Sequence, residues 1–123
     1  MLDVGDETLT GGGSKLKKLV MEATRHALQT WTGQELTPTS LYGIRKYTEG
    51  GILNTHVDRL PLVLSATINV AQDTEEEWPL EVFGHDGRAY NITMTPGDMI
   101  LYESHSVLHG RPFSLKGRYY ANL

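Results

Sequence analysis

Cysteine is absent from this chain of 123 residues. Its absence excludes disulfide scaffolds, thiolate metal sites and cysteine nucleophiles together. Histidine and carboxylate side chains are then the remaining protein ligands for a transition metal. The chain carries five histidines and 15 acidic residues, so both ligand types are available.

Long apolar runs and clustered basic residues are also missing. No stretch approaches the ~20 consecutive apolar residues that a membrane-spanning helix needs. The formal net charge is −4, and the basic residues are scattered apart from Lys15, Lys17 and Lys18. A surface that tracks nucleic-acid phosphates would need such residues in a patch or stripe. We therefore expect a water-soluble protein with no membrane span and no nucleic-acid partner.

The length suits one domain with one hydrophobic core. Residues 1–13 are acidic and glycine-rich, without the basic start and apolar run of a secretory signal. We expect them to form a flexible leader, and the compartment stays open. Residues 14–123 are expected to form the single domain. The chain stops at Leu123, inside its last predicted strand, so a piece of a larger protein is one expectation.

One amphipathic helix is predicted over residues 14–32. Ser14 is a candidate N-cap, and Gly33 is a stop signal. His26 lies at the edge of the apolar stripe and is interpreted as a packing or surface residue. The apolar residues fall at helical spacing on one stripe: Leu16, Leu19, Val20, Ala23, Ala27 and Trp31.

After residue 41 the pattern changes to short segments rich in β-branched and aromatic residues, separated by glycine-containing turn signals. Eight strands at this spacing are typical of a sandwich or barrel. We predict a mainly β fold, a double-stranded β-helix (jelly roll, cupin-like) with one N-terminal amphipathic helix. The predicted strands cover residues 41–48, 52–59, 62–70, 79–84, 87–94, 98–103, 105–112 and 117–123.

The triplet His56-Val57-Asp58 falls in a predicted strand, where residues two apart project from the same face. An imidazole and a carboxylate can then reach one ion, although a surface His and Asp would give the same triplet. A third ligand could come from three places. His85 lies between glycines in a hairpin signature and is expected at an exposed tip. His105 and His109 share the predicted strand 105–112.

The order of these motifs resembles the prolyl 4-hydroxylase branch of the 2-oxoglutarate-dependent oxygenases. In that family a His-x-Asp pair is followed, about fifty residues later, by a histidine, a nearby proline and a basic residue that leads a strand. His109, Pro112 and Arg118 fit, since Arg118 follows His109 by nine residues and His105 by thirteen.

Further matches extend the resemblance over residues 41–123: Tyr42 and Tyr47 before the His-x-Asp, Ile68-Asn69, and the strand led by Pro96-Gly97-Asp98. Two features depart from the family's pattern. Trp78-Pro79 replaces a glycine pair that the family often carries. The position of a tyrosine that commonly helps to hold the cosubstrate falls near Thr67.

The resemblance implies an enzyme that hydroxylates a peptidyl, prolyl substrate, with His56, Asp58 and His109 as Fe(II) ligands. Two imidazoles and one carboxylate leave positions open for a chelating 2-oxo acid and for dioxygen. Ascorbate is a further expected cofactor. Arg118 is expected to bind the distal carboxylate of 2-oxoglutarate, although a surface-paired strand arginine would look the same.

Tyr47 and Thr67 are expected to line the cosubstrate pocket. Arg111 and Arg59 are expected either to touch substrate or to form exposed salt bridges. Two other functions stay open. One is a catalytically silent jelly-roll subunit of a larger assembly, and the other is a zinc or manganese cupin-type enzyme.

Overall fold

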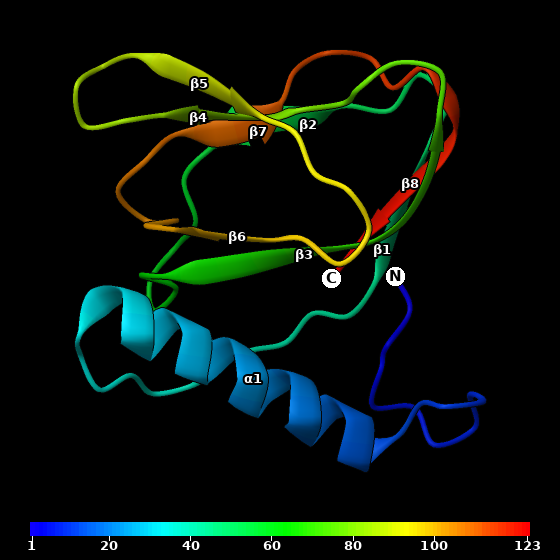
Figure 1. Ribbon diagram of the computed structural model, residues 1–123, viewed down its shortest axis with the longest axis vertical. Coiled ribbons are helices and arrows are strands. Elements are labelled where there is room, and N and C mark those ends of the chain that lie inside the picture. Colours follow the sequence, from blue (N-terminus) through cyan, green and yellow to red (C-terminus); the bar gives the residue numbers. More distant parts are fainter.

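The computed structural model describes all 123 residues and contains one helix and eight strands (Figure 1). Helix α1 spans Ser14–Thr32, as the sequence predicts. It ends at Gly33, which takes a left-handed conformation at φ 70° and donates its N–H to the Gln29 carbonyl at 2.8 Å. Glycine suits this position because it has no Cβ to clash there.

The predicted cap of this helix is wrong. Gly13 occupies the N-cap position, and no side chain caps the helix from within. Instead the Glu7 carboxylate accepts the Ser14 N–H at 2.8 Å from seven residues upstream. That hydrogen bond holds the pKa of Glu7 below its usual 4.5, because it favours the charged carboxylate. The chain folds back to bring this acid to the positive end of the helix dipole.

Residues 1–13, expected as a flexible leader outside the domain, lie against the rest of the molecule. Leu2 and Ile44 exchange two backbone hydrogen bonds of 2.7 Å, and Val4 is 5% exposed. The segment therefore contributes a β-bridge and one core residue.

All eight predicted strands are present, most of them shorter than the sequence suggests. Strand β3 is the long one and runs past its predicted end. The strands are β1 Arg45–Thr48, β2 Leu53–His56, β3 Ser65–Thr74, β4 Leu80–Phe83, β5 Ala89–Ile92, β6 Met99–Tyr102, β7 His109–Arg111 and β8 Gly117–Asn122.

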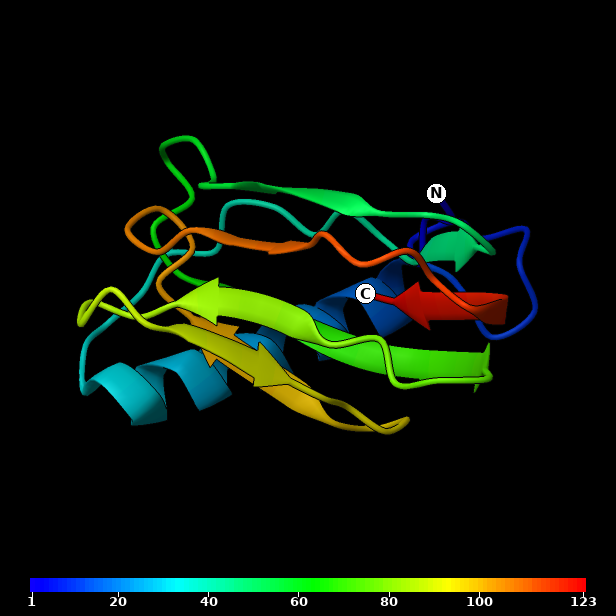
Figure 2. The same cartoon turned by 90° about the horizontal axis from the view of Figure 1, so that it is seen from above.

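The strands form two antiparallel four-stranded sheets in the orders β1-β8-β3-β6 and β2-β7-β4-β5. The sheets face one another as a β-sandwich, and α1 lies against the outer side of the first sheet (Figures 1 and 2). The fold is thus mainly β with one helix, as predicted. No helix in the structure combines the length and the apolar content that crossing a membrane requires.

The hydrophobic core is small. Trp78, Leu115 and Tyr120 are at most 4% exposed, and Tyr47 packs against them. The aromatic rings meet edge to face, with centroid distances of 5.0 Å for Tyr47–Trp78 and 5.2 Å for Trp78–Tyr120. Such edge contacts suit the ring quadrupoles.

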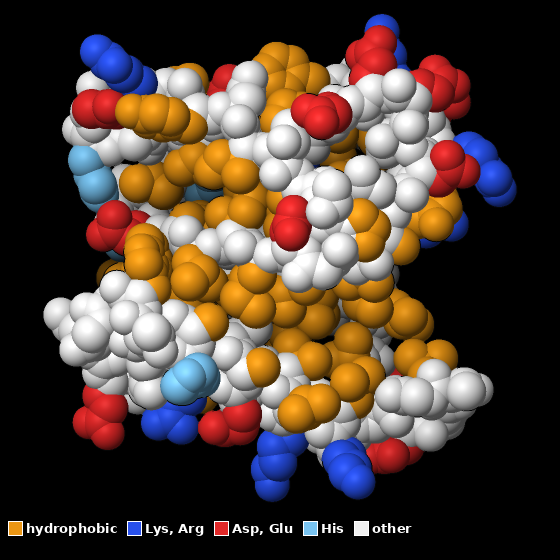
Figure 3. Space-filling view, viewed as in Figure 1, with side chains coloured by type: hydrophobic (Ala, Val, Ile, Leu, Met, Phe, Trp, Pro, Cys, Tyr) orange, Lys and Arg blue, Asp and Glu red, His pale blue; other side chains and the backbone are white.

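Helix α1 has no fully buried residue. Apolar side chains line a hollow between the helix and the sheets (Figure 3). This hollow belongs to a cavity of about 900 Å³ whose lining also includes the inner-face residues described below.

Candidate metal centre

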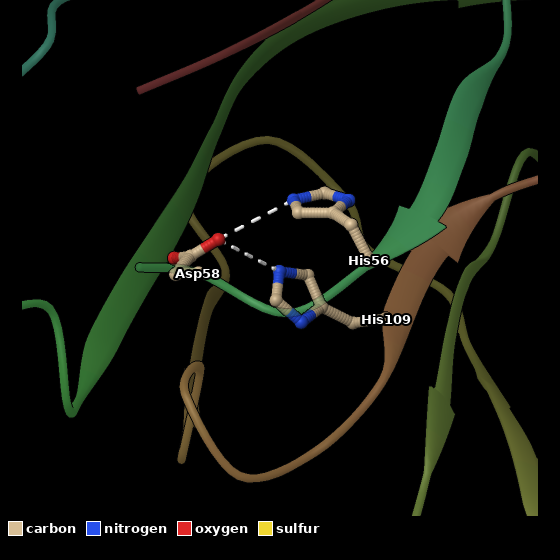
Figure 4. A group of neighbouring side chains, drawn as sticks. All are labelled: His56, Asp58 and His109. Carbon is tan, nitrogen blue, oxygen red and sulfur yellow. Dashed lines mark ion pairs between the residues drawn. The ribbon is translucent and has the colours of Figure 1, made fainter. Parts of the chain in front are cut away.

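Three side chains converge inside the sandwich: His56, Asp58 and His109 (Figure 4). One ligand atom from each lies within 4.8 Å of the others. The Asp58 Oδ1 lies 3.3 Å from the His56 Nε2 and 3.4 Å from the His109 Nε2. The two imidazole rings are 4.5 Å apart between centroids and tilted by 54°.

Two neighbouring strands deliver the histidines. His56 is the last residue of β2 and His109 the first of β7, and the two are direct partners across that ladder. Asp58 was predicted to share the strand of His56, and this is wrong. The chain leaves the ladder after His56, and the Asp58 N–H bonds the Ser104 carbonyl at 2.8 Å instead. The carboxylate therefore reaches the histidines from a loop.

Hydrogen bonds to backbone carbonyls orient both imidazoles. The His56 Nδ1 lies 2.6 Å from the Asn54 carbonyl, and the His109 Nδ1 lies 3.0 Å from the Val107 carbonyl. A carbonyl can only accept, so each Nδ1 carries the hydrogen and, in the neutral ring, each Nε2 keeps a lone pair. Both lone pairs face the Asp58 carboxylate. Three electron-rich atoms thus meet without a hydrogen between them, and a cation satisfies all three.

The spacing also suits first-row metal ligation. Ligands about 2.1 Å from an ion and at right angles to one another lie about 3.0 Å apart. The observed separations of 3.3 and 3.4 Å are close to that value. Two imidazoles and one carboxylate on one face of an octahedral ion leave three positions open, the donor set of non-haem iron(II) oxygenases. The group could hold a metal ion.

The other two candidate histidines lie apart from this group. His85 is at an exposed hairpin tip, as predicted, and its Nε2 lies 2.7 Å from the Glu103 carboxylate. His105 was predicted to share a strand with His109, but it lies in the turn before β7. Its Nδ1 bonds the backbone carbonyl of Asp58 at 2.8 Å, so it supports the loop that carries the carboxylate. His109 is the histidine that joins the pair.

Comparison with known proteins adds no relative. The chain matches no protein-family model, no curated protein and no solved structure. The resemblance to the prolyl 4-hydroxylase branch therefore rests on the sequence motifs of this chain alone.

The structure does not bring Arg118 to the cavity. Its side chain is 84% exposed, and its Nη1 lies 3.2 Å from the Asp73 carboxylate. The interior position of β8 is filled by Tyr120, which is 2% exposed. The nine-residue spacing from His109 selects the strand correctly, but the guanidinium pairs at the surface. Arg118 therefore does not lie where it could bind the distal carboxylate of 2-oxoglutarate beside the three ligands, contrary to the prediction.

Arg111 was expected either to touch substrate or to form an exposed salt bridge, and its burial, at 2% exposure, excludes the exposed salt bridge. Its guanidinium carbon lies 4.8 Å from the Trp78 ring centroid and 4.6 Å from that of Tyr120. Its Nη1 donates to the Trp78 carbonyl at 2.5 Å and its Nη2 to the Tyr120 hydroxyl at 3.4 Å. No carboxylate lies within 4.0 Å of it, although it lines the same cavity as the three ligands.

Burial lowers the pKa of the Arg111 guanidinium, and the neighbouring Tyr120 partly offsets this effect. An arginine still keeps its proton at neutral pH. The interior of the sandwich therefore holds a positive charge without a neighbouring acid.

Tyr47 and Thr67, both expected to line the pocket, are part of the cavity wall. A third wall residue was missed: Tyr102, the last residue of β6. Its ring meets that of His109 at 4.8 Å, and its hydroxyl lies 3.4 Å from the Thr67 Oγ1. Burial raises the pKa of the Tyr102 phenol, so the hydroxyl keeps its hydrogen. The sequence signal for Tyr102 was its position in the predicted strand 98–103, directly before the predicted strand that holds His109.

Proposed function

We propose that this chain is an Fe(II)- and 2-oxoglutarate-dependent dioxygenase of the prolyl 4-hydroxylase type, acting on a peptidyl, prolyl substrate. One observation carries the proposal: the Nε2 atoms of His56 and His109 both face Asp58 at 3.3 and 3.4 Å, with each Nδ1 already bonded to a carbonyl. Hydrogen bonds of this kind, from the ring nitrogen that does not face the metal, fix the ring orientation of metal-ligating histidines.

The proposal includes a jelly-roll topology for the sandwich. Strands β1, β3, β6 and β8 form one sheet, and β2, β4, β5 and β7 form the other. The chain crosses from one antiparallel sheet to the other at every step except β4 to β5, and this crossing supports a double-stranded β-helix. The histidine ligands then come from facing ends of one ladder, β2 and β7, at the inner surface of that sheet.

The residues of the chain have distinct parts in the proposed reaction. His56, Asp58 and His109 would hold iron(II), and the carboxylate offsets part of its charge. Bound iron, with 2-oxoglutarate and dioxygen, supplies the oxidation that turns a substrate C–H bond into C–OH and gives succinate and carbon dioxide. Ascorbate would keep the iron reduced. The buried side of the site limits the entry of water from behind His109.

Exposure of the ligands supports a large substrate. The His109 side chain is 2% exposed, whereas that of His56 is 40% and that of Asp58 is 19%. The centre is thus closed behind His109 and open beside His56. The loop that carries Asp58 adds exposed apolar side chains, Val57 at 42% and Val63 at 50%. A polypeptide segment can approach the centre from this open side. A deep, closed pocket would instead admit small molecules alone.

The test is succinate formation with iron(II), 2-oxoglutarate, ascorbate and dioxygen, first without and then with a library of proline-containing peptides. We expect succinate and one equivalent of bound iron in the intact protein, and neither in His109→Ala. His85→Ala is the matched control, because His85 lies at an exposed hairpin tip, pairs with Glu103 and does not contact the ligand group. An intact protein that binds no iron and forms no succinate would favour the silent structural subunit.

A further inference from the structure

We propose that Arg111 binds the far carboxylate of the 2-oxo diacid, the place that sequence spacing assigned to Arg118. This inference rests on the proposed function and names the anchor of its cosubstrate. It begins from the burial of Arg111, which is 2% exposed and has no carboxylate within 4.0 Å.

A buried charge without a counter-charge is costly. Taking a guanidinium out of water is compensated when an anion and well-placed hydrogen bonds replace the lost hydration. The protein supplies two neutral acceptors, the Trp78 carbonyl and the Tyr120 hydroxyl. It also supplies two aromatic faces, which stabilise a cation but do not neutralise it. An anionic ligand supplies the missing charge.

The position of Arg111 suits a diacid that also reaches the metal. Arg111 follows His109 by two residues on β7, so the two side chains project from the same face of the strand. Two residues of strand advance by about 6.6 Å. An extended five-carbon diacid spans such a distance, with its 2-oxo acid end at the ligand group and its far carboxylate at Arg111. Both residues line the one cavity.

The guanidinium is also held ready for a carboxylate. An arginine has five N–H donors, and two are used by Trp78 and Tyr120, which leaves three. Contact with the two rings and the two hydrogen bonds hold the guanidinium in place, and a fork held in this way can pair with a carboxylate through parallel hydrogen bonds. The Tyr102 hydroxyl, near Thr67, adds a neutral donor to the same wall.

A purely structural Arg111 would make the same contacts with Trp78 and Tyr120, so the experiment must ask for the carboxylate itself. The probes are 2-oxoglutarate and 2-oxopentanoate, which has the same chain length but no far carboxylate. Each acid is titrated by calorimetry into the Mn(II)-loaded protein. Mn(II) takes the place of iron so that the acid binds without being oxidised. We expect the wild-type protein to prefer 2-oxoglutarate by about 100-fold, as suits a buried charge-assisted pair.

Arg111→Met should bind the two acids within a few-fold of each other, whereas Arg118→Gln should keep the wild-type preference. Circular dichroism and Mn(II) binding verify that each variant is folded. If Arg111→Met does not fold, Arg111→Lys replaces it, since it keeps the charge but loses the fork. We expect its preference to fall to about 10-fold.

Three outcomes overturn the assignment. If Arg111→Met or Arg111→Lys keeps the wild-type preference for 2-oxoglutarate, or if Arg118→Gln loses it, another residue binds the far carboxylate. The proposed function then still stands. Equal binding of the two acids by the wild-type protein means that no far-carboxylate site exists. A wild-type protein that binds Mn(II) but neither acid overturns the proposed function and this assignment together.

Discussion

His109 and Arg111 project from the same strand into the same cavity, and each is 2% exposed. The strand is only three residues long, and the residue between them is Gly110. A Cβ added at Gly110 would lie 2.8 Å from both the Leu53 carbonyl oxygen and the Thr55 Cα on β2. The close approach of β2 to β7 therefore depends on this glycine, and it is what brings His56 beside His109.

Gly110→Ala is expected to weaken metal binding as well as stability. The added methyl group pushes β2 from β7 and separates the two imidazoles, at a cost of about 1–3 kcal/mol in the free energy of unfolding. Urea unfolding measures the stability and Co(II) titration the affinity. Gly33→Ala is the control, because it strains the end of α1, far along the chain from the ligands, and should lower stability alone. Equal Co(II) affinities in both variants would contradict this role of Gly110.

Asp58→Asn should have opposite effects with and without metal. In the metal-free protein, an amide N–H can donate to a histidine Nε2 where two acceptors now face each other. We expect the free energy of unfolding to rise by about 1 kcal/mol. Metal ions should then stabilise the variant far less than the wild-type protein. Thermal unfolding in chelator and in excess Mn(II) compares the two states, with Asp73→Asn as a surface control.

Acid should loosen the start of α1 through Glu7. The folded-state pKa of Glu7 lies below the usual 4.5, so its contribution to stability is present above that pH. The contribution is lost as the pH falls through the folded pKa, because the unfolded state then binds the proton more readily. Glu7→Gln should therefore show a smaller loss of stability between about pH 5 and pH 3. Glu35→Gln is the control, and identical acid profiles for Glu7→Gln and the wild-type protein would exclude this cap.

Arg118→Gln should have almost no effect on stability or on metal affinity. The ion pair with Asp73 is exposed, and exposed pairs contribute about 0–1 kcal/mol. We expect its unfolding midpoint in urea and its Mn(II) affinity to match those of the wild-type protein. A variant that loses Mn(II) affinity would show that this arginine acts on the centre after all.

An apolar stripe at helical spacing predicts the helix of this chain, and short segments rich in β-branched and aromatic residues between glycine turn signals predict all eight strands. Local patterns do not fix where a strand leaves its ladder. Strand β2 ends at His56 because the Asp58 N–H finds the Ser104 carbonyl, which lies 46 residues further along the chain. The Glu7 cap of α1 likewise depends on a chain reversal that no capping motif signals.

Arg118 and Arg111 illustrate a second limit of prediction from sequence, which concerns the direction of a side chain on its strand. Spacing from His109 places Arg118 on β8, but a register irregularity beside Asp73 and a close contact of Gly117 with Thr74 determine its neighbourhood. One of the two roles expected for Arg111 was an exposed salt bridge, because charged side chains usually lie at the surface. Strand alternation with His109 would have placed it inside, and that signal was available in the predicted strand 105–112.

The rings that enclose Arg111 are also most of the hydrophobic core: Trp78 and Tyr120, with Leu115 beside them. A diacid that neutralises this guanidinium would therefore reinforce the packing of the whole sandwich. If the proposed diacid binds there, the resistance of the protein to unfolding and to proteolysis would depend on the concentration of that diacid, because the ligand-free protein would unfold more often.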